Sequence, residues 1–436
     1  MTTINRLPVE LFSSIFLKVC DGLFDPELMS SKGDADSNLL TAAINLSSVT
    51  SFWRQVAVST PQLWTAIVIP FGYRDFDTLS SMVKIRLERA GGAPLDLAIK
   101  IALSPPLNDF QHIWGLVVPH LSHCQHLTLT NIDSSFVPHL LPLPGTLNDL
   151  QWLNVQANLT ETLGQTPVPT LFRLGQESGA PSLARLEIRG INCPPEAFSK
   201  LSNLAMDFER VTYPRQSIVR QYLEGSPLLD TLIMLARSIL QDVEGDILDP
   251  IPLPLLRRVA FGHWEWPDSI AAPAAQHVVL FENTVPRIAS LTPTDFPTVE
   301  HISICSLMRS SNETVPLLPI FPCVRRIDIV RCGAAYPILQ LLMNTSSEQD
   351  EFPALEELVI CRSGRFDRAG REVVPTLKAL LGARPQLKVL CDTDSLEWSP
   401  QWHGWTELAP ELSGKIKQLI GSPLPAWASL AIYDEA

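Results

Sequence analysis

The chain has 436 residues, of which 46% are hydrophobic and 18% charged, as is typical of a folded globular protein. Its net charge of −13 disfavours both nucleic-acid binding, which needs a basic surface, and binding to anionic membranes. The sequence has no apolar run long enough to span a membrane, no secretory signal and no CxxC pair that would indicate zinc. We therefore expect a cytoplasmic or nuclear protein with reduced cysteines and no cofactor.

The first predicted element is a helix that begins near Leu7. Residues 7–16 read LPVELFSSIF, and the apolar residues Leu11 and Ile15 recur at helical spacing. Pro8 suits a helix start, because its fixed φ is helical and it lacks an N–H that would otherwise have no partner.

A polar loop is predicted next, over residues 21–38, which are rich in Gly, Ser and Asp. The following segment, LLTAAINLSSVTSFWRQVAVSTPQLWTAI, predicts further helix. Its apolar residues at 46, 49, 53 and 56 fall on one helical face.

Together the two segments resemble an F-box, whose pattern LPxEhhxxIF opens the chain and whose second half ends in STPQLW in large fungal families. Thr50 stands where many of those relatives carry cysteine. The resemblance implies a three-helix module over residues 1–69 that binds the Skp adaptor, and through it the cullin, of a ubiquitin ligase. By this resemblance the residues that face or support the adaptor are Leu7, Pro8, Leu11, Ile15, Leu46, Val49 and Trp53.

Residues 70–436 are predicted to form a second domain of repeats. A strand at 64–69, a helix at 79–90 and a strand at 95–102 form a first, atypical repeat. From residue 120 one pattern recurs: an apolar residue, two variable residues, an apolar residue, one variable residue and an apolar residue. Several copies follow a proline, which is tolerated at the start of a strand because no backbone N–H is needed there. The pattern predicts strands at 124–129, 150–155, 183–188, 201–206, 229–234, 256–261, 299–304, 324–329, 355–360 and 387–390. Apolar residues at helical spacing predict helices at 216–224, 335–344, 372–381 and 406–420.

This pattern resembles degenerate leucine-rich repeats. One such repeat cannot cover its own apolar face, so neighbouring repeats stack. We therefore predict an α/β solenoid with parallel strands in sequence order. The apolar residues of each copy should be buried, among them Leu186, Leu232, Ile302, Ile327 and Leu358.

Two groups of residues are candidates for binding a target protein. Val330, Val359 and Cys361 lie on the second face of the later strands, where exposed apolar groups would mark a partner site. The alternative is that loops cover them. Trp264 and Trp266 in GHWEWP are candidate aromatic anchors, with core packing as the alternative.

These features favour recognition over catalysis. We expect the substrate-recognition subunit of a Skp–cullin–F-box ligase, which accelerates transfer by proximity and has no catalytic residue of its own. The Asp-x-Asp runs at 34–36 and 392–394 leave open a metal-dependent transferase on a doubly wound sheet. His120, His123 and His126 fit a polar helix end better than a metal site. A repeat scaffold without a ligase role is a third alternative.

Overall fold

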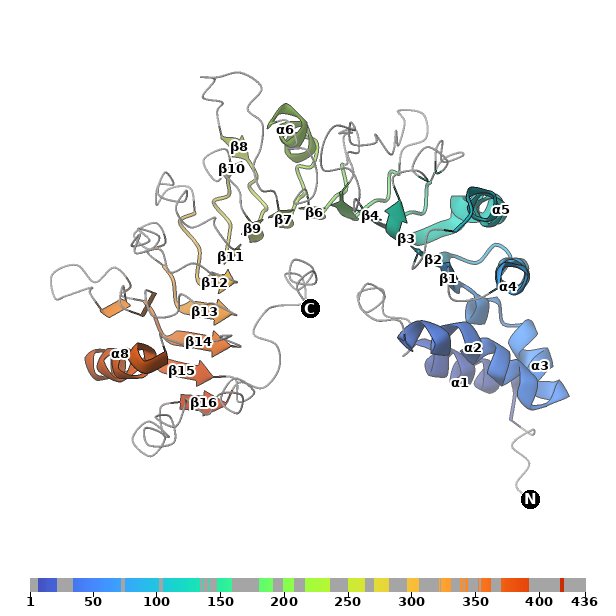
Figure 1. Cartoon of the computed structure of the whole chain (residues 1–436), viewed down its shortest axis with the longest axis horizontal. Coiled ribbons are helices and arrows are strands. Elements are labelled where there is room, and N and C mark those ends of the chain that lie inside the picture. The colour runs from blue at the N-terminus through green and yellow to red at the C-terminus, as the bar shows by residue number, and fades with distance from the viewer. Residues whose placement is uncertain are drawn as a thin grey trace. The chain divides into compact units, whose positions relative to one another are not determined.

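The chain divides into two compact units, residues 1–202 with 210–212 and residues 203–209 with 213–436, and each is described by itself (Figure 1). The predicted boundary at residue 69 falls inside the first strand of the first unit. The structure, a computed structural model, describes residues 7–21, 34–71, 75–101, 105–133, 136, 140, 147–158, 180–190, 199–207, 216–235, 250–262, 270–281, 296–305, 321, 323–330, 338–339, 342–343, 352, 354–361, 370–391 and 416–418.

Three α-helices open the first unit: α1 (Val9–Asp21), α2 (Asp34–Val49) and α3 (Ser51–Val58). The predicted loop at 21–38 is wrong at its end, because α2 already begins at Asp34; residues 22–33 lie outside the described residues.

Thr50 separates α2 from α3, so Leu46, Val49, Trp53 and Val56 do not share one helix as predicted. The backbone of Thr50 is extended, and its Oγ1 accepts a hydrogen bond from the backbone N–H of Trp53 at 3.1 Å. Thr50 is therefore the N-cap of α3. Trp64, at the end of the 3-10 helix η3 (Pro61–Trp64), is buried and donates its indole N–H to the carbonyl of Ala57 at 2.8 Å.

Replacing this cap should weaken the helical module measurably. Thr50→Ala removes the acceptor for the Trp53 N–H and is expected to lower the free energy of unfolding by about 1 kcal/mol. Chemical denaturation measures the change. Ser48→Ala, which removes a hydroxyl bonded to the Ile44 carbonyl within α2, is the control and should stay close to wild type. An unchanged midpoint for Thr50→Ala would contradict the cap assignment.

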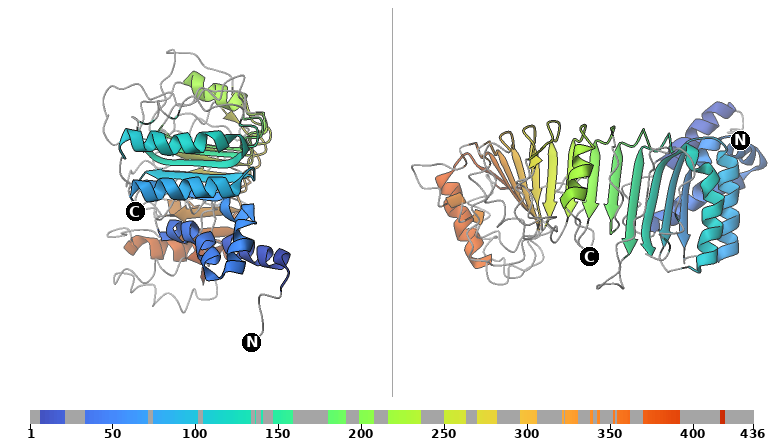
Figure 2. Two further views of the ribbon diagram at one scale, coloured as in Figure 1. Left: turned by 90° about the vertical axis from the view of Figure 1, so that its right-hand side faces the viewer. Right: turned by 90° about the horizontal axis from the view of Figure 1, so that it is seen from above.

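Among the described residues of the first unit, five parallel strands form a sheet in sequence order. Helices α4 and α5 connect the first three strands and lie on one side of them (Figure 2). Asp75 caps α4 by accepting from the Thr78 N–H, and Gly91 ends it with a positive φ of 57°. The elements are β1 (Ala66–Phe71), α4 (Phe76–Ala90), β2 (Leu95–Ile101), α5 (Leu107–Val117), the 3-10 helix η4 (Val118–His123), β3 (Cys124–Asp133), β4 (Trp152–Asn158) and β5 (Arg185–Arg189).

The second unit continues the same architecture, with neighbouring strands parallel and in sequence order. A separate two-stranded sheet pairs β8 with β10. The elements are β6 (Asn203–Asp207), α6 (Gln216–Glu224), β7 (Thr231–Leu235), β8 (Ile251–Pro252), β9 (Arg258–Gly262), β10 (Ile270–Ala271), β11 (His277–Leu280), β12 (His301–Cys305), β13 (Arg326–Val330), β14 (Glu357–Cys361), α8 (Gly370–Ala383), β15 (Lys388–Cys391) and β16 (Ile416–Gln418).

The predicted fold class is thus confirmed: helices precede parallel strands in sequence order. The apolar residues of the repeat pattern form its core, and Leu186, Leu232, Ile302, Ile327 and Leu358 are at most 1% exposed. They line up from strand to strand, since the register pairs Ile302 with Ile327 and Ile327 with Leu358. Each repeat therefore buries its apolar face against the next.

Proline precedes the strands because it belongs to a turn. In the first such copy the carbonyl of Ala180 accepts from the N–H of Leu183 at 3.0 Å, with Pro181 at the second turn position. That position favours the fixed φ of proline. Six further turns have the same hydrogen bond, in which a backbone carbonyl accepts from the N–H three residues later. The accepting residues are Ser226, Leu253, Ala272, Phe321, Phe352 and Arg384.

Further elements differ from the prediction, since α5, β8 and β10 are not predicted. Strand β11 lies in the long gap between the strands predicted at 256–261 and 299–304, where no strand is predicted. At the C-terminal end, residues 416–418 form β16 and not part of a helix over 406–420, while the rest of that range lies outside the described residues. Of the predicted helix at 335–344, residues 338–339 and 342–343 are described and are helical. None of the described helices has the length and apolar character needed to cross a membrane.

Candidate functional site

Helix α1 carries apolar residues on two faces, and the first unit buries one of them. Phe12 and Phe16 are each 1% exposed, and both rings contact the ring of Trp53, at centroid distances of 5.8 and 5.0 Å. The other face is exposed. We call Leu11, Ile15 and Val19 the α1 stripe; they are 51%, 48% and 51% exposed and recur every four residues.

The predicted adaptor-binding residues divide into exposed and supporting ones. Leu7, Pro8 and Val49 are exposed like Leu11 and Ile15, whereas Leu46 and Trp53 are half-buried. The carbonyl of Pro8 accepts from the N–H groups of Leu11 and Phe12 at 3.1 and 3.2 Å, so Pro8 starts α1 as predicted.

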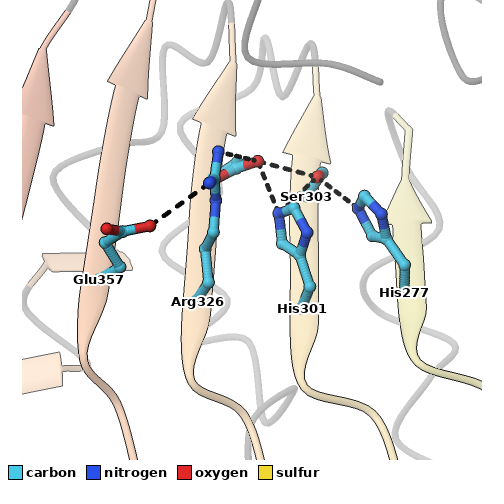
Figure 3. A network of polar contacts seen from close by, with 6 residues as sticks. His277, His301, Ser303, Arg326 and Glu357 are labelled. Carbon is cyan, nitrogen blue, oxygen red and sulfur yellow. Dashed lines mark hydrogen bonds and ion pairs between the residues drawn. The ribbon is translucent and has the colours of Figure 1, made fainter. Parts of the chain in front are cut away.

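A network of polar side chains crosses four strands of the second unit, β11 to β14 (Figure 3). The register brings its members together, since it pairs His277 with His301 and Ser303 with Asp328. This polar network comprises His277, His301, Ser303, Arg326, Asp328 and Glu357.

Asp328 is the centre of the polar network, and its side chain has no exposed area. Its Oδ2 accepts from Nε2 of His301 at 2.6 Å and from the hydroxyl of Ser303 at 3.3 Å. Nε of Arg326 donates to Oδ1 at 2.8 Å, and Nη1 of the same arginine reaches Oε2 of Glu357 at 3.3 Å. The buried carboxylate is therefore both paired and hydrogen-bonded, as a buried charge requires.

His277 extends the polar network to β11. Its Nε2 lies 2.9 Å from Oγ of Ser303, and its ring stacks on that of His301 with the centroids 3.7 Å apart. Because Ser303 gives its one proton to Asp328, the Nε2–H of His277 must donate to Ser303. His301 must likewise carry its proton on Nε2, since the ionised carboxylate of Asp328 can only accept.

Two ionisable groups of the polar network, His277 on β11 and Asp328 at its centre, are held in different charge states. Burial, and after it the neighbouring His301, lower the pKa of His277 to about 3. Burial by itself raises the pKa of Asp328, but the hydrogen bond from His301 and the charge of Arg326 outweigh it, so that this pKa lies below its ordinary value. His277 is therefore neutral and Asp328 ionised at neutral pH.

The polar network joins strands and does not present a reactive group. Ser303 lies beside a histidine and an aspartate, but it is fully buried and its proton is already bonded to Asp328. A nucleophile needs access to its substrate and a base that takes its proton, and this serine has neither.

Apolar side chains lie on the same face of these strands, at the alternate positions that follow the polar network. Gly262 of β9 belongs to this face, because a Cβ atom there would lie 2.6 Å from Cδ2 of Leu235. We call the buried group the apolar cluster; it consists of Ile233, Leu235, Ala260, Val279, Phe281, Cys305 and Val330.

The predicted target-binding residues are not exposed where the structure describes them. Val330, Val359 and Cys361 are at most 3% exposed, which agrees with the alternative that other parts of the chain cover them. Trp264 and Trp266 lie outside the described residues. Binding of a target protein at any of these five residues stays a prediction. At Val330, Val359 and Cys361 it requires that the parts of the chain covering them move away.

The structure describes only some of the candidate metal ligands. Of the two Asp-x-Asp runs, residues 34–36 lie in the first turn of α2 and residues 392–394 lie outside the described residues. His120 and His123 contact each other ring to ring, whereas Nδ1 of His126 lies 2.6 Å from Oδ1 of Asp96. Within the part of the chain that is described, no three His, Cys, Asp or Glu side chains gather closely enough to hold a metal ion.

Comparisons with known proteins give no family. No family model and no curated protein matches the chain. Among solved structures the chain is similar to a Bacteroides fragilis protein from a structural genomics consortium, with 16% identity over 50% of this chain and 68% of that one. The TM-score is 0.32, so this likeness carries no argument about fold or function.

Proposed function

We propose that this chain is the substrate-recognition subunit of a Skp–cullin–F-box ubiquitin ligase. In this proposal α1 to α3 bind the Skp adaptor, and the repeat sheet binds a target protein. The observation that carries the proposal is the exposed α1 stripe. One apolar face of α1, with Phe12 and Phe16, packs against Trp53, whereas the face that carries the stripe remains exposed. Apolar area left in water on a small module favours burial against a partner.

The positions of the exposed residues support the adaptor as that partner. The F-box resemblance expects seven residues to face or support the adaptor, and five of them, Leu7, Pro8, Leu11, Ile15 and Val49, are exposed. Leu46 and Trp53 are half-buried, and the ring of Trp53 packs behind α1. A parallel repeat sheet in turn suits a protein-binding scaffold, since repeat folds present extended surfaces.

Binding of purified Skp adaptor to the full chain tests the proposal, with Ile15→Glu as the disrupting variant. A charge placed in the middle of an apolar contact should cost about 2 kcal/mol or more, which corresponds to at least about 30-fold weaker binding. Titration calorimetry measures the dissociation constant. The Leu7→Ala/Pro8→Ala double variant tests the start of the same surface and should also weaken binding.

Ile85→Glu is the matched control. Ile85 is also an isoleucine on a helix of the first unit, is 43% exposed compared with 48% for Ile15, and lies on α4 outside the proposed surface. It should bind adaptor as wild type does. Equal binding by the Ile15→Glu and wild-type chains, or no adaptor binding by the wild-type chain, would refute the proposal.

Two other functions, a metal-dependent transferase and a repeat scaffold without a ligase role, fit the structure to different degrees. The strands follow sequence order, which disagrees with the doubly wound sheet expected for a metal-dependent transferase. A repeat scaffold without a ligase role shares the fold and the α1 stripe with our proposal. The adaptor titration separates these two, because a scaffold whose helices bind another partner leaves the adaptor unbound.

A further inference from the structure

The apolar cluster on the second face of the repeat sheet is hidden from water. Its members are at most 6% exposed, and each of them lies in a strand or directly after one, as Phe281 does after β11. The described helices contribute no residue to it. An apolar sheet face is hidden only where another layer packs on it. A further part of the chain therefore covers the apolar cluster.

The connections between the strands do not supply this cover. Strands of the second unit are parallel and in sequence order, and right-handed crossovers between such strands all lie on one face of the sheet. Helices α6 and α8 belong to two of these crossovers, and their buried side chains, such as Tyr222 and Leu380, are not members of the apolar cluster. The crossovers therefore lie on the opposite face, which the core residues Leu232 and Ile327 line.

Residues 419–436 belong to the second unit and follow β16, the last described strand, so they are not a crossover. They begin at the level of the apolar cluster. The register pairs Gln418 with Cys391 and continues through β14 and β13 to Ile304 of β12. Since Cys305 directly follows Ile304, the chain leaves β16 at the height at which Cys305 lies on its own strand.

The length and composition of residues 419–436 also suit the cluster. Neighbouring strands lie about 4.8 Å apart, so the seven steps from β16 to β7 span about 34 Å, which residues 419–436 exceed at about 3.3 Å per residue when extended. The segment reads LIGSPLPAWASLAIYDEA, with large apolar residues such as Trp427 and Leu430 and with no basic residue. Packing of these side chains on the cluster removes both apolar surfaces from water.

We propose that residues 419–436 of this chain occupy the second face of β7 to β13 and cover the apolar cluster. Another apolar segment then binds this face only by displacing residues 419–436. The proposal gives the burial of Val330, a predicted target-binding residue, a cause within the chain itself. It goes beyond the proposed function and does not depend on adaptor binding by the α1 stripe.

Alkylation of the full chain by iodoacetamide, followed at each cysteine by mass spectrometry, tests the proposal. Cys305 is a member of the apolar cluster and has no exposed area, so its thiol reacts only when the cover opens. In the disrupting variant Trp427→Asp/Leu430→Asp, burial of the segment requires burial of two charges, so Cys305 should react at least about 10-fold faster than in wild type. An excess of a synthetic peptide of residues 419–436 should slow the reaction again.

Ser422→Asp/Ser429→Asp is the matched control variant, because it adds the same two charges to the same segment at positions that are already polar. Its Cys305 should react as slowly as in wild type. Two other thiols serve as internal references: Cys323, which is exposed, and Cys124, which is buried in the first unit. Their rates should be the same in all variants.

An unchanged Cys305 rate in a monomeric disrupting variant, or an equal rise in the control variant, would overturn the proposal, because another part of the chain then covers the cluster. A disrupting variant that dimerises and that the peptide returns to a monomer supports it, since a second copy then occupies the vacated face. Should the disrupting variant not fold, photoreactive benzoylphenylalanine in place of Trp427 decides. Cross-links to β7–β13 support the proposal, and cross-links only elsewhere overturn it.

Discussion

Replacement of Leu358 by aspartate is expected to unfold at least the repeats around β14. Leu358 has no exposed area and lies between Ile327 of β13 and Val389 of β15 in the register of the sheet. An aspartate there would place a carboxylate among apolar side chains with no donor or cation at its position. Burial of an unpaired charge costs several kcal/mol, so we expect a loss of more than about 4 kcal/mol.

Leu255→Asp is the matched control for this change. Leu255 is a leucine of the same unit in the turn before β9, but it is 49% exposed, so its carboxylate can remain in water. Thermal unfolding followed by circular dichroism should show an early transition for Leu358→Asp and a nearly wild-type curve for Leu255→Asp. Similar curves for the two variants would show that β14 is not part of a packed core.

The repeat strands could be predicted from sequence because two local signals coincide. Alternate apolar residues indicate a strand, and the proline before them indicates where it begins. Most of the strands start about two residues later than predicted, although β3 begins at Cys124 as expected. β5 begins at Arg185, since Leu183 still closes the turn with Ala180. In these copies the first apolar residue of the repeat pattern is thus the last residue of the turn before the strand.

Strand β11 was missed because alanine stands where the other copies have a larger apolar residue. Ala275, Val278 and Leu280 repeat the same spacing, and all three are at most 1% exposed. The turn before them is the one that precedes its neighbours, with a hydrogen bond from the Ala275 N–H to the Ala272 carbonyl across Pro273. Proline spacing would have located this strand where hydrophobicity did not.

The polar network and the burial of the second sheet face could not be predicted from a local pattern. His277 and Ser303 are 26 residues apart in the chain and meet only through the register of β11 with β12. Alternation shows that residues such as Val359 share a face, but the exposure of that face depends on distant parts of the chain. Helix α1 is a second example. It has apolar residues at helical spacing on two faces, and the local sequence does not show which face the rest of the unit buries.

Removal of the carboxylate of Asp328 should be nearly as damaging as a charge at Leu358, for the opposite reason. Asp328→Ala deletes the acceptor shared by His301, Ser303 and Arg326, and leaves the three donor groups without it at a site without exposed area. Removing one partner of a buried ion pair typically costs about 3–5 kcal/mol. Glu357 still pairs with Arg326, so we expect the lower part of that range.

Two further variants separate the loss of charge from the loss of shape. Asp149→Ala removes an exposed carboxylate from the first unit and should change the free energy of unfolding by less than about 0.5 kcal/mol. Asp328→Asn keeps the size of the side chain and one acceptor oxygen, and it should fall between Asp328→Ala and wild type, because the imidazole of His301 can change tautomer to accept from the new amide. Urea denaturation ranks the three. If Asp328→Ala is as stable as Asp149→Ala, the polar network contributes nothing to the cohesion of β11 to β14.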